Sequence, residues 1–331
     1  MGPSGGTVLP HPRRSGDGGP ADDGGAPPGP VLRSPVGSPE QLRDGLQAGA
    51  IAGLRYCPRA LWQPASQAAG ALMGAHPAPP VRQWMLNAEV MTSSRPSAGQ
   101  VRAAVVSWAR TQVVSMQLPR WSPGRIAAAV SWDPAALDLL RTAAGSRGAV
   151  VALPHMGSWD LAGAWVAGQG LPVTTVAERL PDPQFDLFVR TRNRLGMRVH
   201  ANTETGVMRH LLDDVSSGRL VCLVADRDLS GSGIATHWRT ARGAVDGRIP
   251  PGPAHLAVLT GAALIGAACH YTDPTHMRID FSPVLEPPPT GSSRRRAWAL
   301  TDRLAEWFSM RIRDHVQDWH MFQPFFDGVR P

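Results

Sequence analysis

Short apolar runs alternate with helix-like segments from Ala149 onward, and this alternation constrains the fold more than any other feature of the chain. The first run, Ala149–Leu153, contains no polar side chain and stops at Pro154. Runs of this length and composition are typical of strands buried on both faces of a sheet. The same reasoning predicts strands at 149–153, 173–177, 198–201, 220–225, 263–269 and 277–284.

Helical segments fill the intervals between these runs. The sequence predicts helices at 160–168, 183–195, 204–216, 253–261 and 293–316. Strands that alternate with helices build parallel βαβ units. We therefore expect an α/β fold with a mostly parallel central sheet covered by helices on both faces.

The chain before Ala149 divides into a tail and a helical segment. Residues 1–37 are rich in Gly, Pro, Ser and Asp, and they have too few large apolar side chains to offset the entropy of ordering, so we predict a disordered tail. A capping box with proline at the first helical position, Ser38–Gln41, marks the expected start of order. Helices are then expected over 41–74, with interruptions near Pro58 and Pro64, and over 101–116 and 133–145.

These patterns predict a single domain over residues 38–330, with a helical lead-in at 38–145 and an α/β core at 146–330. The three cysteines have no metal-ligand spacing and lie in apolar settings, which favours reduced thiols in a cytosolic compartment. The sequence has neither an apolar run of transmembrane length nor a signal-peptide core. Two interpretations of the apolar residues at 54–62 stay open. These residues belong to a helix that packs on the core, or to one that contacts a membrane surface.

The basic residues are all arginine. There are 33 of them, and the formal net charge is +7. An arginine-only set together with abundant Ala, Gly and Pro indicates a GC-rich genome, so the charge is poor evidence for a nucleic-acid partner and none is expected. Because the arginine fork binds phosphate oxygens bidentately, lipid head groups and coenzyme phosphates are the expected anionic targets.

A histidine and an aspartate flank the turn after the first strand. His155 follows Pro154 directly, and Asp160 comes five positions later, in the expected first turn of a helix. Open α/β sheets place reactive groups at the carboxyl ends of their strands, and the helix dipole favours a carboxylate in the first turn. We expect His155 to act as a general base whose tautomer Asp160 fixes. The competing interpretation is a core histidine beside a helix-capping aspartate.

This turn carries a His-x-x-x-x-Asp signature and resembles the lysophospholipid acyltransferase superfamily. Stretches that follow it resemble, in the expected order, the branch that contains bacterial lipid A acyltransferases and phosphatidylinositol mannoside acyltransferases. They are 176–179, 188–196, 221–228 and 250–254, and a C-terminal signature at Asp318–Gln323. The resemblance covers roughly residues 45–327.

The resemblance implies a membrane-peripheral acyltransferase. It would move a fatty acyl chain from acyl-CoA, as co-substrate, to a hydroxyl of a membrane glycolipid such as phosphatidylinositol mannoside, or of a phospholipid. No further cofactor is expected, and an acyl carrier protein stays open as the alternative donor. The expected location is the cytoplasmic face of the cell membrane.

Asp226 is the third catalytic candidate. The mannoside enzymes of this branch typically have a glutamate here that contacts the catalytic pair, so the shorter aspartate weakens the case for a mannoside acceptor; the alternative is an Asx turn at a strand end. Candidates for substrate binding follow other strand ends or lie on the next helix. They are Glu178, Arg179, Arg192 and Arg227. Their alternatives are a local salt bridge for the first two and solvated surface for the others.

No metal site is predicted, because no His, Asp or Cys cluster joins His155 at ligand spacing. Ser230–Gly233 is interpreted as a lid, and His320 as a structural residue beside Trp319. Two other functions stay open. One is a catalytically weak acyl-lipid-binding protein of the same fold, and the other is a thioester hydrolase in which His155 activates water.

Overall fold

The computed structural model describes residue 45, residues 48–228, residue 231 and residues 233–330. The predicted tail at 1–37 and the capping box at Ser38–Gln41 lie outside the described residues. The predicted lid at Ser230–Gly233 lies largely outside them as well.

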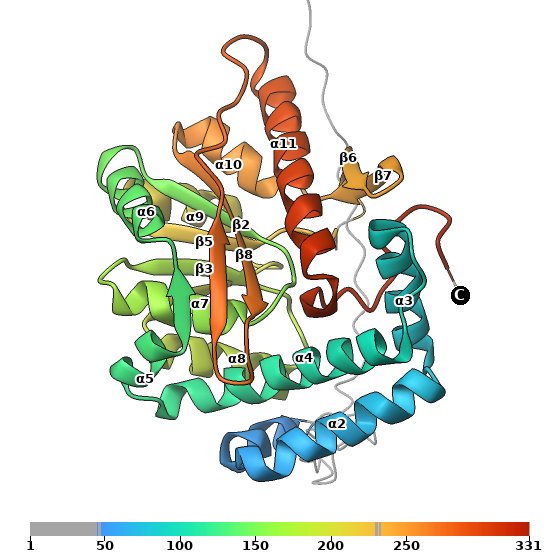
Figure 1. The fold of residues 1–331 in the computed structure, drawn as a ribbon. Helices are drawn as coiled ribbons and strands as arrows, with labels where there is room; N and C mark the ends of the chain where they lie inside the picture. The colour runs from blue at the N-terminus through green and yellow to red at the C-terminus, as the bar shows by residue number, and fades with distance from the viewer. Residues whose placement is uncertain (1–44, 46–47, 229–230, 232, 331) are drawn as a thin grey trace, which may run out of the picture.

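A seven-stranded sheet forms the centre of the molecule (Figure 1). In spatial order its strands are β1 (Val130–Trp132), β9 (Met277–Phe281), β8 (Ala263–Tyr271), β2 (Ala149–Leu153), β5 (Leu220–Val224), β3 (Val173–Ala177) and β4 (Met197–Ala201). The strands from β8 to β4 run parallel to one another. Strand β9 is antiparallel to β8 and parallel to β1. The sheet is therefore mostly parallel, which confirms the predicted fold class.

Helices cover both faces of this sheet. One face carries α9 (Val207–Ser216), α10 (Gly252–Thr260) and α11 (Ser293–Asp314), and the other carries α6 (Pro134–Ser146) and α7 (Trp159–Gly168). Strand β2 shows the division, because Val150 and Ala152 belong to the first core while Ala149 and Val151 belong to the second. Helix α8 (Asp182–Arg194) packs along β4.

The lead-in is helical, as predicted (Figure 1). Its elements are η1 (Leu54–Tyr56), α2 (Arg59–Ala75), α3 (Pro79–Thr92), α4 (Ala98–Gln117), η2 (Leu118–Arg120) and α5 (Pro123–Ala128). Of these, α3, α4 and α5 contact the sheet domain, and α2 packs on the outside of α4. The expected interruption near Pro64 is wrong, since α2 continues through it at the cost of one backbone hydrogen bond. Glycines let α2 lie close to α4: a Cβ on Gly70 would come within 2.9 Å of the Arg102 carbonyl oxygen.

The sequence patterns did not anticipate several elements. They include β1, α3, α5 and the antiparallel hairpin of β6 (Ile234–Thr240) and β7 (Gly243–Ile249). Strand β6 does alternate, with Thr236, Trp238 and Thr240 buried and the residues between them more exposed. Its buried positions are mostly polar residues, so the alternation of apolar and polar side chains is weak.

The described helices include none that is both long enough and apolar enough to cross a bilayer.

The turn between β2 and α7 lies against the backbone of β8. Gly157 has a φ of +56°, and its N–H donates to the carbonyl oxygen of Asp318 at 2.9 Å. A Cβ at this position would lie 2.6 Å from the carbonyl oxygen of Cys269. Only glycine satisfies both the left-handed backbone and this close approach.

We expect Gly157→Ala to lower the free energy of unfolding by about 2 kcal/mol or more, because left-handed strain of ~1–2 kcal/mol is added to the clash with β8. Urea denaturation followed by circular dichroism measures this change. Gly168→Ala is the matched control, since a Cβ there meets no atom within 4 Å; it should stay within ~0.5 kcal/mol of the wild type. Equal stability of the two variants would contradict the prediction.

Candidate active site

His155 and Asp226 form the centre of the site. His155 follows β2 and Asp226 follows β5, and these two strands are neighbours in the sheet. Nδ1 of His155 lies 2.6 Å from Oδ1 of Asp226, and the backbone N–H of His155 donates to Oδ2 at 2.9 Å. Both carboxylate oxygens of Asp226 thus bind the same histidine.

The carboxylate of Asp226 is completely buried. Burial opposes its ionisation, but the nearby charge of His155 and hydrogen bonds from His155 and Trp319 outweigh burial and lower the pKa of Asp226 below its ordinary value. The indole Nε1 of Trp319 supplies one of these bonds, donating to Oδ2 at 2.8 Å. A carboxylate that accepts several hydrogen bonds stays ionised even in an apolar setting.

This geometry sets the tautomer of His155. Because an ionised carboxylate only accepts hydrogen bonds, Nδ1 must carry a proton, and Nε2 of the neutral ring keeps its lone pair. The side chain of His155 is 28% exposed and lines a cavity of about 590 Å³. An imidazole held in this way is arranged to take a proton from a bound group.

The expectation that Asp160 fixes the imidazole is not what the structure shows. Asp160 lies in the first turn of α7, as predicted, but its Oδ1 accepts from Nε of Arg192 at 2.7 Å. Both side chains are largely buried. The arginine of α8 has drawn this carboxylate away from the histidine, and Asp226 takes the orienting position.

Of the other predicted residues, Glu178, Arg192 and Arg227 line the same cavity, whereas Arg179 does not. Glu178 and Arg227 line it and form an ion pair at 3.1 Å, so the salt bridge of Glu178 joins it to Arg227 and not to its chain neighbour. The backbone N–H of Arg179 donates to the side chain of Asn202, and its guanidinium lies over the ring of Phe185. The structure therefore brings all the predicted site residues to one edge of the sheet.

A second, smaller cavity adjoins the first; the two are called the narrow and the wide cavity below. Its lining is apolar apart from a few groups, and Trp159, Asp160 and Arg192 line both cavities. It lies between the sheet and α7, with Val151 and Val166 on its wall. The Asp160–Arg192 pair therefore stands where the polar cavity meets the apolar one.

The C-terminal segment completes the site, and sequence reasoning missed most of its contribution. The backbone N–H of His320 donates to the carbonyl oxygen of His155 at 2.7 Å, and Met156 pairs with Trp319 in an isolated bridge. The only signal was the C-terminal signature, which does not indicate a contact with His155. Its hydrogen bond to Asp226 makes Trp319 part of the site.

His320 also lies in a polar chain beneath the turn. Its Nε2 is 3.0 Å from Oγ of Ser107, and this hydroxyl donates to Asp318 at 2.6 Å. Burial lowers the pKa of His320 to about 3, with the charge of His155 adding to the effect, and burial raises the pKa of Asp318 to about 6. Burial therefore keeps His320 neutral down to low pH, whereas Asp318 is still largely ionised at neutral pH. The structural role expected for His320 stays a prediction.

The sequence of the chain matches a known protein family. The family described as bacterial lipid A biosynthesis acyltransferase matches residues 38–327. The chain belongs to this family. It is an acyltransferase, and the recognition and enzyme class inferred from the sequence are confirmed.

Curated relatives come from mycobacteria. The chain is 37% identical to a phosphatidylinositol mannoside acyltransferase of Mycolicibacterium smegmatis over 229 residues, covering 68% of this chain and 71% of the relative. It is 34% identical over 226 residues to proteins of that name from two strains of Mycobacterium tuberculosis, covering 67% of this chain and 68% of each relative.

The contacts predict different effects for the two aspartates. We expect Asp226→Asn to lower kcat of acyl transfer by about 10³-fold or more, because an amide no longer fixes the tautomer or stabilises an imidazolium. Asp160→Asn should mainly lower the free energy of unfolding, by about 2 kcal/mol, because it leaves Arg192 without its charged partner. Steady-state kinetics and urea denaturation of both variants separate these effects. A larger loss of kcat in Asp160→Asn would reverse the assignment.

The depressed pKa of His320 predicts a pH-dependent stability. The pKa of folded His320 keeps it neutral down to about pH 3, whereas the unfolded residue binds a proton near the ordinary histidine pKa of 6.5. Acidification through this window therefore favours the unfolded state, and the stability returns as the pH rises. We expect wild type to lose stability more steeply than His320→Gln between these pH values in urea titrations. Parallel curves would show that His320 does not titrate in this way.

Proposed function

We propose that the chain transfers a fatty acyl group from acyl-CoA to a hydroxyl of a glycolipid acceptor, in the class of phosphatidylinositol mannoside, with His155 as general base. The observation that carries the proposal is the buried Asp226 carboxylate on Nδ1 of His155, beside two connected cavities. The names of the mycobacterial relatives support the acceptor class.

The chemical step follows from this arrangement. Nε2 of His155 takes the proton of the acceptor hydroxyl as its oxygen attacks the thioester carbonyl carbon. The tetrahedral intermediate then collapses, the C–S bond breaks, and the imidazolium returns the proton to the leaving thiolate. Asp226 stabilises the imidazolium between these two events, so both protein groups end the cycle as they began it.

Direct transfer without an acyl-enzyme is the form of the reaction that the site favours. Of the described cysteines, Cys222 lines the narrow cavity, but burial raises the pKa of its thiol to about 12. A thiol of that pKa supplies almost no thiolate at neutral pH. The acceptor hydroxyl is therefore the nucleophile in our proposal.

The two cavities divide the substrates by polarity. The apolar lining of the narrow cavity suits the hydrocarbon chain of the donor, and the arginines on the rim of the wide one suit phosphate groups of donor or acceptor. Arg227 keeps 29% of its side chain exposed, within reach of such a ligand.

Membrane attachment belongs to the proposal as well. Tyr56, Leu61 and Leu72 are exposed on η1 and α2, and the guanidinium groups of Arg55 and Arg120 lie over the ring of Tyr56. Exposed apolar side chains beside arginines favour binding at an anionic lipid surface. We propose that this part of the lead-in holds the enzyme on the cytoplasmic face of the membrane.

The test is transfer by the purified full chain. Labelled palmitoyl-CoA and a total polar lipid extract of the host are incubated with wild type, His155→Ala and His276→Ala, and products are read by lipid mass spectrometry. We expect an acylated glycolipid with wild type and with His276→Ala, whose histidine does not line the wide cavity, and loss of at least about 10³-fold with His155→Ala.

The other outcomes are equally specific. Release of free palmitate that added lipid does not diminish would favour the hydrolase. Binding of palmitoyl-CoA without turnover by wild type would favour the acyl-lipid-binding protein. A stable acyl-enzyme in a rapid-quench experiment would overturn direct transfer.

A further inference from the structure

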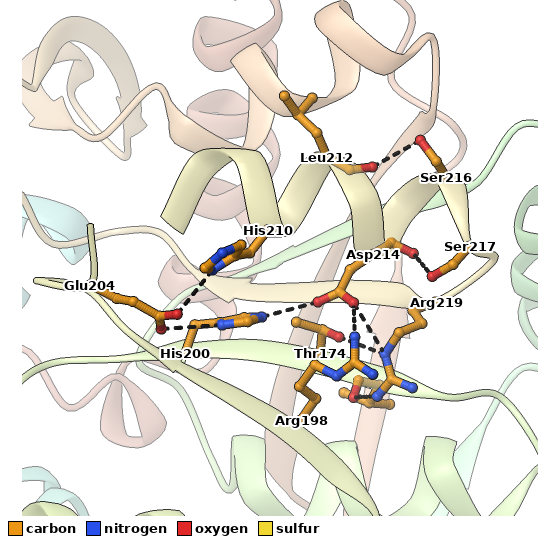
Figure 2. A network of polar contacts seen from close by, with 11 residues as sticks. Thr174, Arg198, His200, Glu204, His210, Leu212, Asp214, Ser216, Ser217 and Arg219 are labelled. Atoms are coloured by element: carbon orange, nitrogen blue, oxygen red, sulfur yellow. Dashed lines mark hydrogen bonds and ion pairs between the residues drawn. The ribbon is translucent and has the colours of Figure 1, made fainter. Parts of the chain in front are cut away.

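Two histidines and a glutamate converge beside β4, outside the wide cavity. His200 lies near the end of β4, Glu204 in the loop that follows, and His210 on α9 (Figure 2). One nitrogen or oxygen from each side chain lies within 4.8 Å of those of the other two. The sequence holds them as His-x-x-x-Glu followed six residues later by His, a spacing that spans a strand end, a turn and a helix.

The distances suit a small cation between the three groups. Nδ1 of His200 is 3.2 Å from Oε2 of Glu204, and Nδ1 of His210 is 2.9 Å from Oε1 of the same residue. Ligands at 2.0–2.1 Å in a tetrahedral zinc site are about 3.4 Å apart. The buried Nδ1 of His210 lies at this short distance from the carboxylate without reaching hydrogen-bond geometry, which leaves room for an ion between the two groups.

A buried carboxylate orients the first histidine. Nε2 of His200 lies 3.1 Å from Oδ2 of Asp214, whose side chain is 3% exposed and also contacts Arg198 and Arg219 (Figure 2). When Nε2 of His200 donates to Asp214, Nδ1 is the ring nitrogen that faces Glu204. Metal-binding histidines are held by the same carboxylate–imidazole contact.

We propose that His200, Glu204 and His210 bind a divalent transition metal of the zinc class. Two imidazole nitrogens and one carboxylate are a donor set that zinc prefers, and Asp214 supplies the supporting contact. The side chains of Glu204 and His210 are 37% and 43% exposed, so the fourth position faces solvent. This proposal differs from the sequence expectation of no metal, which considered only residues spaced around His155.

The bound metal joins the loop after β4 to α9. Asn202 in this loop and Val207 and Leu211 at the start of α9 line the wide cavity. Metal binding therefore fixes one rim of the cavity without touching His155. The metal holds the loop and α9 in place and takes no part in acyl transfer itself.

A second cluster among the described residues does not share this arrangement. His270, Asp280 and His315 also lie close together, but the two imidazole rings stack at 3.6 Å with an angle of 7° between their planes. Lone pairs in parallel stacked planes do not converge on one ion. Asp280 is moreover paired with Arg278 and Arg311, which occupy its oxygens.

Direct metal binding tests the proposal. Full-length protein stripped with a chelator is titrated with Zn²⁺ in competition with a chromophoric chelator, and with Co²⁺ followed by its visible absorption. We expect one Zn²⁺ per chain, d–d bands typical of a low-coordinate Co²⁺ site, and a rise in Tm with Zn²⁺. Glu204→Gln and His210→Ala should each raise the Kd for Zn²⁺ at least about tenfold and abolish the rise in Tm.

His237→Ala is the matched control, because His237 is an exposed histidine that also contacts carboxylates outside the cluster. It should bind Zn²⁺ as wild type does, and circular dichroism should show all variants folded. Absence of stoichiometric binding in wild type, unchanged affinity in both cluster variants, or loss of binding only in His315→Ala would each overturn the proposal. None of these measurements depends on acyl transfer.

Discussion

The arrangement of the site depends on one buried carboxylate. Asp226 lies just after β5 and binds both the backbone N–H and the side chain of His155, which follows the neighbouring strand β2. Desolvating such a group is costly unless its oxygens are fully bonded, and three donors meet that need here. The same contacts that make burial tolerable also fix the direction of the imidazole, so the stability of this region and the geometry of the candidate site depend on the same hydrogen bonds.

The C-terminal segment extends this arrangement to the lead-in. Trp84 on α3 donates its indole N–H to the carbonyl oxygen of Trp319, and the side chain of Asn87 donates to those of Met321 and Gln323. A helix from the first third of the chain thereby holds the segment that holds Asp226. The helical lead-in therefore helps to position the candidate active site, through its contacts with the C-terminal segment.

The sequence predicted the central strands well because their signal is local. The strands at 149–153 and 173–177 are found at those residues, since an unbroken apolar run between turn residues has few other solutions. The family and the location of His155 followed from motifs. The partner of His155 did not follow from a motif. Asp160 is near His155 in sequence, but its carboxylate binds Arg192 on α8. Asp226 comes near His155 only in the folded sheet. The hairpin after Gly233 was not predicted because two of the three buried positions of β6 are threonines, which weakens the alternation of apolar and polar side chains.

The dependence of the site on Trp319 and His320 has a consequence for biosynthesis. The ribosome adds residues 318–320 after all the strands of the sheet, and until then Asp226 lacks one of its donors and the His155 carbonyl lacks its partner. The imidazole of His155 therefore reaches its final setting only once this segment has packed against the sheet.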